Sequence, residues 1–269
     1  MLRRGTNSPV AFWLPAAMVA PTPVSALLHA VAVVKAGVFT VLKVIVLIFG
    51  IDPLAQSRTS GWLLWIAGAT IVLASLAALR QDNLKKLLAY STVSQLSYVV
   101  LAAALFTPVA AIGAALHIAA HALSKITLFF AAGSIYTAAH KTEVSELHGI
   151  GRRMPWTMGA FAVGALSMIG LPPAAGFISK WYMLSGAMAA SHWVAVVVIV
   201  ASTLLNAAYL LPIVYRAFFR ECAGGEEARH GEAPLPMVIA LTTTAVGTIL
   251  LFFMPDVPLA LARLMLGEG

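Results

Sequence analysis

Charged side chains are scarce in this chain of 269 residues. Only 10% of its residues are Asp, Glu, Lys or Arg, whereas 61% are hydrophobic, and a typical soluble domain is about 25% charged. Several apolar runs also reach the roughly 20 residues that a helix needs to cross a bilayer. The sequence therefore predicts an all-α polytopic membrane protein.

Other absences exclude whole classes of chemistry. The one cysteine, Cys222, excludes an internal disulfide. The pair His117 and His121 reads H-I-A-A-H, without the glutamate of a zinc protease. No C-x-x-C, G-x-G-x-x-G or P-loop is present, so we expect no metal, no cofactor and no catalytic or redox site. The net charge of +7 is explained by membrane topology, and no nucleic-acid partner is expected.

Seven apolar runs predict about seven transmembrane helices. We expect a start segment at 1–21, six helices over 22–215, a loop at 216–233, and a last helix with a tail over 234–269. Asp82 is expected to cap the third helix. The runs are Thr22–Phe49, Gly61–Leu79, Leu84–Phe106, Pro108–Ala139, Trp156–Gly186, Trp193–Tyr215 and Pro234–Met254.

The fifth run contains a predicted break. Its sequence SMIGLPPAAGFISKW carries Pro172 and Pro173 between Gly170 and Gly176, and two adjacent prolines cannot continue a regular helix. Broken backbone within a bilayer is tolerated only where protein or water covers it, as at the ion sites of transporters. A simple proline kink is the alternative. We expect a helix broken at Gly170–Pro173.

Basic residues predict the orientation. Eleven of the 17 Lys and Arg residues fall on one side of the seven runs, and only Arg58 and Arg263 on the other. Because cytoplasmic loops are enriched in basic residues, we expect a plasma or inner membrane protein with a cytoplasmic N-terminus and an extracytoplasmic C-terminus. The eleven are Arg3, Arg4, Arg80, Lys85, Lys86, Lys141, Arg152, Arg153, Arg216, Arg220 and Arg229.

The other four lysines lie inside the runs. Lys43 is near the end of its run and is expected to snorkel toward the membrane surface. Lys35, Lys125 and Lys180 lie deeper, where an ionisable side chain is a functional hypothesis by default.

His117, His121 and Lys125 are spaced i, i+4 and i+8 and so share one helix face, which we call the ladder. Histidine titrates near neutrality, so these groups, with the hydroxyls of Ser124 and Thr127, suit proton transfer. Packing or helix–helix hydrogen bonding is the alternative reading.

Carboxylates are absent from the middle of every run. The buried lysines therefore lack an acidic partner within this sequence. Either they stay neutral much of the time, or another polypeptide supplies the acid, and this favours a chain that works inside a complex or is part of something longer. The ten carboxylates are Asp52, Asp82, Glu143, Glu146, Glu221, Glu226, Glu227, Glu232, Asp256 and Glu268.

Four long motifs resemble one superfamily over about residues 12–220. They are WLPAAMVAPTPVSALLHAVAVVKAGVF, DNLKKLLAYSTVSQLSYVVLA, HIAAHALSKITLFFAAGSI and ELHGIGRRMPWTMGAFAVGALSMIGLPPAAGFISKWYML. They resemble the antiporter-like membrane subunits of respiratory complex I, Mrp-type Na⁺/H⁺ antiporters and membrane-bound hydrogenases. The resemblance is to the C-terminal half, helices 8–14, of that fold.

The resemblance implies roles for particular residues. Lys35 matches the lysine of the eighth helix, a central relay in many members, and His29 matches a histidine beside it. The ladder matches polar positions of the eleventh helix. Lys180 falls just after the broken segment, where the family keeps its terminal lysine or glutamate.

The sequence thus predicts a proton-translocating, antiporter-like subunit, or the C-terminal half of one, that works with other membrane subunits. Its H⁺ transfer would be driven either by redox-linked changes in partner subunits or by exchange for Na⁺ or another monovalent cation. One alternative is a proton-pumping subunit of an NADH:quinone oxidoreductase or hydrogenase, which holds no cofactor itself. A second alternative is a truncated fragment that transports nothing.

Overall fold

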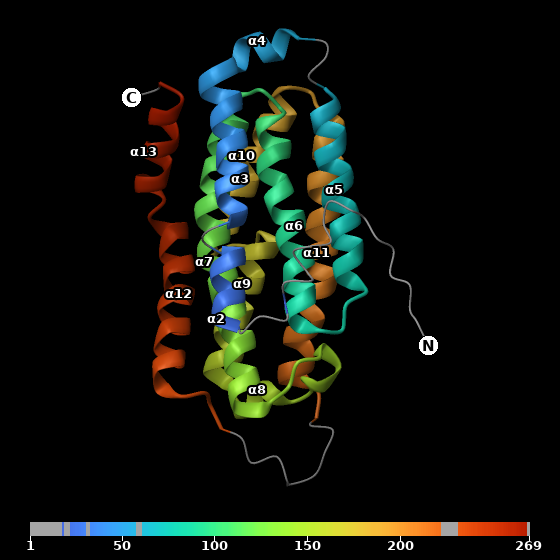
Figure 1. Ribbon diagram of the computed structural model, residues 1–269, viewed down its shortest axis with the longest axis vertical. Coiled ribbons are helices and arrows are strands. Elements are labelled where there is room, and N and C mark those ends of the chain that lie inside the picture. Colours follow the sequence, from blue (N-terminus) through green and yellow to red (C-terminus); the bar gives the residue numbers. More distant parts are fainter. Residues whose placement is uncertain (1–17, 19–21, 31–32, 58–60, 222–230, 268–269) are drawn as a thin grey trace.

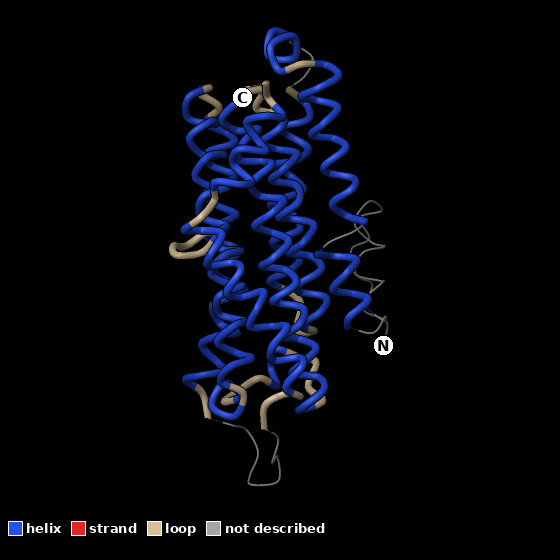
Figure 2. The backbone as a smooth tube through the Cα atoms, turned by 90° about the vertical axis from the view of Figure 1, so that its left-hand side faces the viewer, coloured by secondary structure: helices blue, strands red, loops and turns tan. Residues whose placement is uncertain are grey.

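The computed structural model describes residues 18, 22–30, 33–57, 61–221 and 231–267, and in that part of the chain the structure is a bundle of helices. The long helices lie side by side, with loops mostly at the two ends of the bundle (Figures 1 and 2). The elements are α2 (Thr22–Ala30), α3 (Val33–Lys43), η2 (Val44–Phe49), α4 (Ile51–Gln56), α5 (Trp62–Leu79), α6 (Leu84–Ala103), α7 (Pro108–Ala139), η3 (Val144–Glu146), α8 (Ile150–Arg153), α9 (Pro155–Ile169), α10 (Ala175–Ala189), α11 (Trp193–Phe219), α12 (Leu235–Phe253) and α13 (Asp256–Met265).

Polarity is inverted relative to a soluble protein. Leu73 and Leu204 are 66% and 67% exposed, whereas Ser75, Ser94 and Ser202 are fully buried, and the Ser75 hydroxyl hydrogen-bonds both of the other two. This arrangement favours a lipid surrounding, where exposed apolar side chains cost nothing and backbone polar groups must be satisfied within helices. The chain is therefore a helical membrane protein.

Helix lengths agree only in part with the expected seven spans. Four described helices, α5, α7, α11 and α12, are long and apolar enough to cross a membrane. The first predicted run is formed by α2, α3 and the π-helix η2, and the fifth is divided between α9 and α10. α6 carries two lysines in its first turn and a buried polar face, which lower its hydropathy.

Asn83, rather than the expected Asp82, caps α6. The Asn83 side chain accepts a 3.1 Å hydrogen bond from the Lys86 backbone N–H. Asp82 instead accepts hydrogen bonds of 2.9 and 2.7 Å from the backbone N–H and the hydroxyl of Ser145. This difference arises because the loop after α7 returns to the start of α6.

We call this end of the molecule the basic end. The described basic residues that the sequence assigns to one side all lie here, at the adjoining ends of α5, α6, α7, α8 and α11, lowest in Figure 1. They are Arg80, Lys85, Lys86, Lys141, Arg152, Arg153, Arg216 and Arg220.

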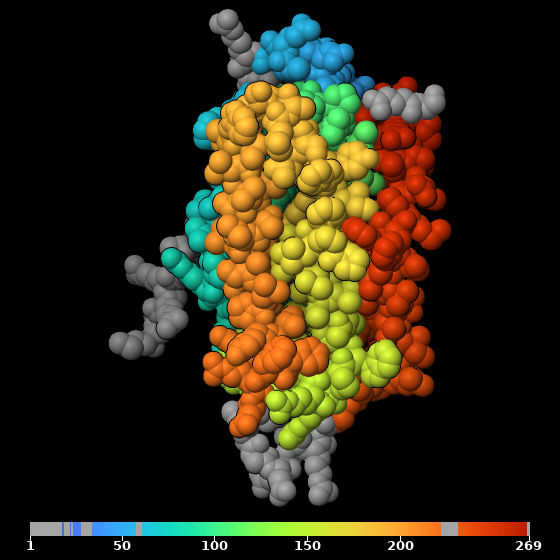
Figure 3. All heavy atoms as spheres, turned by 180° about the vertical axis from the view of Figure 1, so that it is seen from behind, coloured from blue at the N-terminus to red at the C-terminus, as the bar shows by residue number. Residues whose placement is uncertain are grey.

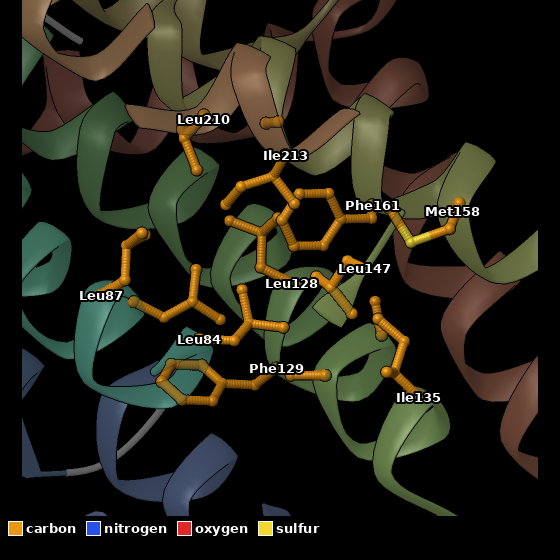
Figure 4. Packing of buried hydrophobic residues seen from close by; sticks show 14 of the residues in the cluster. Leu84, Leu87, Leu128, Phe129, Ile135, Leu147, Met158, Phe161, Leu210 and Ile213 are labelled. Atoms are coloured by element: carbon orange, nitrogen blue, oxygen red, sulfur yellow. The ribbon is translucent and has the colours of Figure 1, made fainter. Parts of the chain in front are cut away.

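An apolar core holds the helices together behind the basic end. It joins side chains from α6, α7, α9 and α11 with Leu147 of the loop after α7 (Figure 4). Phe129, Phe161 and Leu147 are fully buried there. Since several elements meet on these side chains, the core fixes how α6, α7 and α9 face one another, and those three helices carry much of the candidate site. Seen from behind, α11 and α12 flank α9 and α10 on the outer surface of the bundle (Figure 3).

Candidate functional site

The ladder lies in the interior of the bundle. α7 begins after Thr107, whose side chain accepts a 3.3 Å hydrogen bond from the Ala110 backbone N–H, and continues for 32 residues. His117, His121 and Lys125 are all fully buried. The ring centroids of His117 and His121 are 6.1 Å apart. One face of α7 therefore presents three ionisable groups to its neighbours.

His117 brings three elements together. Its Nδ1 is 2.9 Å from the hydroxyl of Ser179 on α10. It also lies close enough to Lys180 and to Lys35 of α3 to interact electrostatically with both. The imidazole can therefore exchange a proton with the Ser179 hydroxyl. The charges on Lys180 and Lys35 change the free energy of protonating it.

Lys125 is held by the neighbouring helix α6. Its Nζ donates a 2.9 Å hydrogen bond to the Leu88 carbonyl oxygen and another hydrogen bond to the Ser91 hydroxyl. A buried amine requires such acceptors, because leaving it unpaired away from water is costly. Lys125 is thus satisfied by a carbonyl and a hydroxyl, and by no described carboxylate.

Lys180 lies at the interruption between α9 and α10. α9 ends at Ile169, Gly170 adopts φ +90°, a cis peptide bond joins Pro172 and Pro173, and α10 begins at Ala175. The two helices lie end to end in Figure 1. This broken segment exposes the last carbonyl groups of α9 to side chains from α10.

The Lys180 amine uses those carbonyl groups. Its Nζ donates hydrogen bonds of 2.9 Å to the carbonyl oxygens of both Met168 and Ile169. The C-terminus of a helix carries partial negative charge. Lys180 Nζ also lies 5.0 Å from the ring centroid of Tyr98, in a cation–π contact. A helix end and an aromatic ring here replace the acidic partner.

Hydroxyl groups connect the ladder helix to the broken segment. Ser124 donates a 2.6 Å hydrogen bond to the Ser167 hydroxyl, which also accepts a 3.1 Å hydrogen bond from the Gly176 backbone N–H. A Cβ atom at Gly176 would collide with the Ser167 carbonyl oxygen, so α10 approaches α9 as closely as a glycine permits. Thr127 points elsewhere, since its hydroxyl bonds to Thr244 of α12.

The remaining predicted residues differ in their surroundings. Lys35 is 7% exposed, and its Nζ has no hydrogen-bond partner among the described residues. Lys43 is exposed, with its Nζ 5.5 Å from the ring centroid of Phe39. His29 belongs to α2, but its side chain lies outside the described part of the chain.

Sequence reasoning missed the polar face of α6. Ser91, Gln95 and Tyr98 are fully buried and spaced i, i+4 and i+7, so they share one side of that helix. Ser91 accepts a hydrogen bond from Lys125, Gln95 donates one to the Met168 carbonyl oxygen, and Tyr98 lies beside Lys180. Polar residues at helical spacing in an apolar run were the available signal.

Comparisons with known proteins agree with this architecture. The family described as NADH:quinone oxidoreductase/Mrp antiporter, TM, matches residues 3–206. Over 256 residues the chain is 37% identical to NADH-quinone oxidoreductase subunit N of Desulforudis audaxviator, which covers 90% of this chain and 50% of that protein. Over 244 residues it is 31% identical to a Na(+)/H(+) antiporter subunit of Alkalihalophilus pseudofirmus, which covers 89% of this chain and 49% of that protein.

A solved structure shares the fold. A chain of the Mrp complex from Dietzia sp. superposes with a TM-score of 0.86 at 21% identity, over 97% of this chain and 56% of that one. The chain spans about half the length of these two curated relatives. Because the family match covers most of the sequence, the chain belongs to the NADH:quinone oxidoreductase/Mrp antiporter transmembrane family.

Proposed function

We propose that this chain translocates protons within a multisubunit membrane complex, through Lys35, His117, His121, Lys125 and Lys180, with His29 beside them. The observation that carries the proposal is the position of His117. It contacts Ser179 and lies within electrostatic reach of Lys180 and Lys35. A proton arriving on one of these groups therefore changes the free energy of protonating the others, as a relay requires.

The acceptors around the lysines support proton transfer over tight cation binding. Lys125 and Lys180 donate to carbonyl and hydroxyl oxygens, and such neutral acceptors serve both the charged and the neutral amine. A carboxylate partner would instead favour the charged form of the amine, so that release of the proton would require the carboxylate to take up a proton itself or to move away. The two amines can thus gain and lose a proton without leaving a buried counter-ion behind.

Lys35 is the point at which another polypeptide would contribute. Its buried Nζ lacks a hydrogen-bond partner among the described residues, and most buried polar groups have one. We propose that a carboxylate of a neighbouring membrane subunit accepts from Lys35 in the assembled complex. The partner subunits expected from the sequence would then complete the relay.

The basic end gives the proposed direction. Its arginines and lysines favour the cytoplasmic side, which would put the N-terminus in the cytoplasm and the C-terminus outside. Seven crossings fit this scheme if α2, α3 and η2 together make the first and α9 and α10 together make the fifth. Protons would leave toward the outside from Lys180.

Two driving forces fit the relatives. The antiporter relative from Alkalihalophilus pseudofirmus suggests exchange of H⁺ for Na⁺ or another monovalent cation. The relative from Desulforudis audaxviator, named as part of an NADH-quinone oxidoreductase, suggests pumping driven by redox chemistry in other subunits. Both cation exchange and redox-driven pumping require proton transfer within the membrane, and the buried lysines and histidines suit that step in either case.

Proton flux in membrane vesicles tests the proposal. The chain is expressed with its neighbouring subunits, and flux is compared between wild type, Lys125→Ala and Lys43→Ala. Lys43 is the matched control, because its side chain is exposed and lies outside the buried network. We expect Lys125→Ala to abolish flux with assembly intact and Lys43→Ala to retain it. Full flux in Lys125→Ala would reject the relay.

A further inference from the structure

A cavity of about 300 Å³ opens at the basic end between α5, α6 and α11. We call it the vestibule. The exposed side chains of Arg80 and Asp82 line it, and so does the buried ring of Tyr209. Leu87 and Ile213, also on its wall, are labelled in Figure 4. A space of this size holds on the order of ten water molecules.

A polar column continues from the vestibule into the bundle. The Tyr209 hydroxyl donates a hydrogen bond to the Asn206 side-chain oxygen, and the Ser91 hydroxyl lies near enough to Tyr209 to interact with it electrostatically. Ser91 in turn accepts a hydrogen bond from Lys125 Nζ. Polar side chains thus lead from the vestibule wall to the ladder.

Asn206 supplies an independent sign of water. Its side chain is fully buried, and its Nδ2 group has no hydrogen-bond partner among the described residues. Buried amide groups are nearly always satisfied, often by an ordered water. Asn206 does not line the vestibule, but its side chain accepts a hydrogen bond from Tyr209, which does. A water that reached the Tyr209 hydroxyl from the vestibule would therefore supply the acceptor that the Asn206 Nδ2 group lacks.

We propose that the vestibule is the proton uptake mouth of this chain, and that Tyr209 and Ser91 carry protons from it to Lys125. The inference rests on the proposed proton translocation and adds where protons enter. It also makes Lys125 the first relay lysine reached from the basic end, ahead of Lys35 and Lys180.

The transfer is balanced at every group. For transfer, the Tyr209 hydroxyl turns from the Asn206 oxygen toward the Ser91 oxygen. A proton from vestibule water then adds to the Tyr209 oxygen as the hydroxyl proton of Tyr209 passes to the Ser91 oxygen. The original Ser91 proton then passes to the neutral amine of Lys125. Each hydroxyl regains the proton it gives, so the net change is one proton gained by Lys125 and one lost by the water of the vestibule.

Thiol labelling tests the mouth directly. Cys222→Ser removes the one native cysteine, and Ala208→Cys then introduces a thiol on the vestibule wall, where Ala208 is exposed. Vesicles of both orientations, carrying the assembled complex, are treated with a membrane-impermeant charged thiol reagent. We expect complete labelling from the cytoplasmic side and a loss of proton flux of roughly tenfold or more, since a positioned proton-transfer group contributes about 10²–10⁴-fold.

Lys86→Cys is the matched control, because Lys86 is exposed at the same end but does not line the vestibule. It should be labelled without loss of flux.

Tyr209→Phe keeps the ring and removes only the hydroxyl, and it should lower flux on the order of tenfold, because water replaces part of the lost contact. Absence of labelling at Ala208→Cys, or full flux after complete labelling, would overturn the inference, as would wild-type flux in Tyr209→Phe.

Lys125→Ala separates the two proposals. If it abolishes flux while labelled Ala208→Cys and Tyr209→Phe both retain it, the relay stands and this mouth is wrong. If Lys125→Ala itself retains flux, the relay is wrong.

Discussion

The Lys180 amine lies at the carboxyl end of α9, where it donates a 2.9 Å hydrogen bond to the Ile169 carbonyl oxygen. The interruption of the helix at Gly170 makes this possible, because it leaves the last carbonyl groups of α9 without partners in their own helix. The helix break therefore provides the hydrogen-bond acceptors of the lysine, and we call the two together the device. It holds the amine of Lys180 inside the bundle without a carboxylate.

Replacing Gly170 by alanine tests this device. Gly170 has φ +90°, and a Cβ atom there would lie 2.6 Å from Lys180 Cδ. We expect Gly170→Ala to destabilise the complex by about 1–3 kcal/mol and to lower proton flux, because the Lys180 side chain must move away from the carbonyl groups of α9. Thermal unfolding and vesicle flux measure the two effects.

Gly159→Ala is the matched control on the same helix. A Cβ atom at Gly159 would have no neighbouring atom within 4 Å, and alanine in a helix interior is favoured over glycine by about 0.5–1 kcal/mol. We expect unchanged flux and unchanged or slightly higher stability. Equal behaviour of the two variants would mean that the tight fit at Gly170 does not control Lys180.

Lys35 provides the second prediction. If a neighbouring subunit supplies a carboxylate to it, Lys35→Met removes one member of a buried pair, which costs about 3–5 kcal/mol. We expect both proton flux and the thermal midpoint of the assembled complex to fall, and Lys43→Met to change neither. A rise in the midpoint would show that Lys35 also lacks a partner in the complex, since removing an unpaired buried amine is stabilising.

The sequence predicts much of this arrangement, and the reasons are local. The spacing of His117, His121 and Lys125 predicts a shared helix face, and Pro172 and Pro173 predict an interruption, because both follow from the geometry of a single helix. The absence of carboxylates from the middle of the runs is likewise visible in the sequence. Such features need no knowledge of how the helices pack.

The acceptors of the lysines could not be predicted in the same way. The carbonyl oxygens of Leu88, Met168 and Ile169 belong to the backbone and leave no mark in the sequence. Ser91 and Tyr98 are recognisable as polar residues, but which lysine each contacts depends on how α6 packs against α7 and α10. The division of the first predicted run into α2, α3 and η2 likewise has no local signal that we can identify.

Ser167 offers a third prediction, at the junction of α9 and α10. Ser167→Ala removes the hydroxyl that accepts from the Gly176 backbone N–H at 3.1 Å. An unsatisfied buried donor costs about 1–3 kcal/mol, so we expect lower thermal stability and faster amide hydrogen exchange in the first turn of α10. Thr70→Ala is the control, because the Thr70 hydroxyl bonds to the Ile66 carbonyl of its own helix at an exposed position. Unchanged exchange at Gly176 would mean that Ser167 does not hold the junction.

Glu232 separates stability from transport. Its carboxylate accepts hydrogen bonds of 2.7 and 3.3 Å from the backbone N–H groups of Trp156 and Thr157 and one of 2.7 Å from the Thr157 hydroxyl. A negative charge at a helix N-terminus contributes about 0.3–1 kcal/mol, so we expect Glu232→Gln to lower the thermal midpoint slightly. We expect proton flux to be unchanged, because α9 separates Glu232 from Ile169 by roughly 20 Å at about 1.5 Å per residue.

The control for Glu232→Gln is Glu221→Gln, which removes an equivalent charge from an exposed side chain beyond the end of α11. It should leave both the thermal midpoint and the flux unchanged. A loss of flux in Glu232→Gln without a change in stability would place Glu232 on the proton path. Because no carboxylate of the described chain hydrogen-bonds a buried lysine, that result would require protons to approach the relay along α9 as well as through the vestibule.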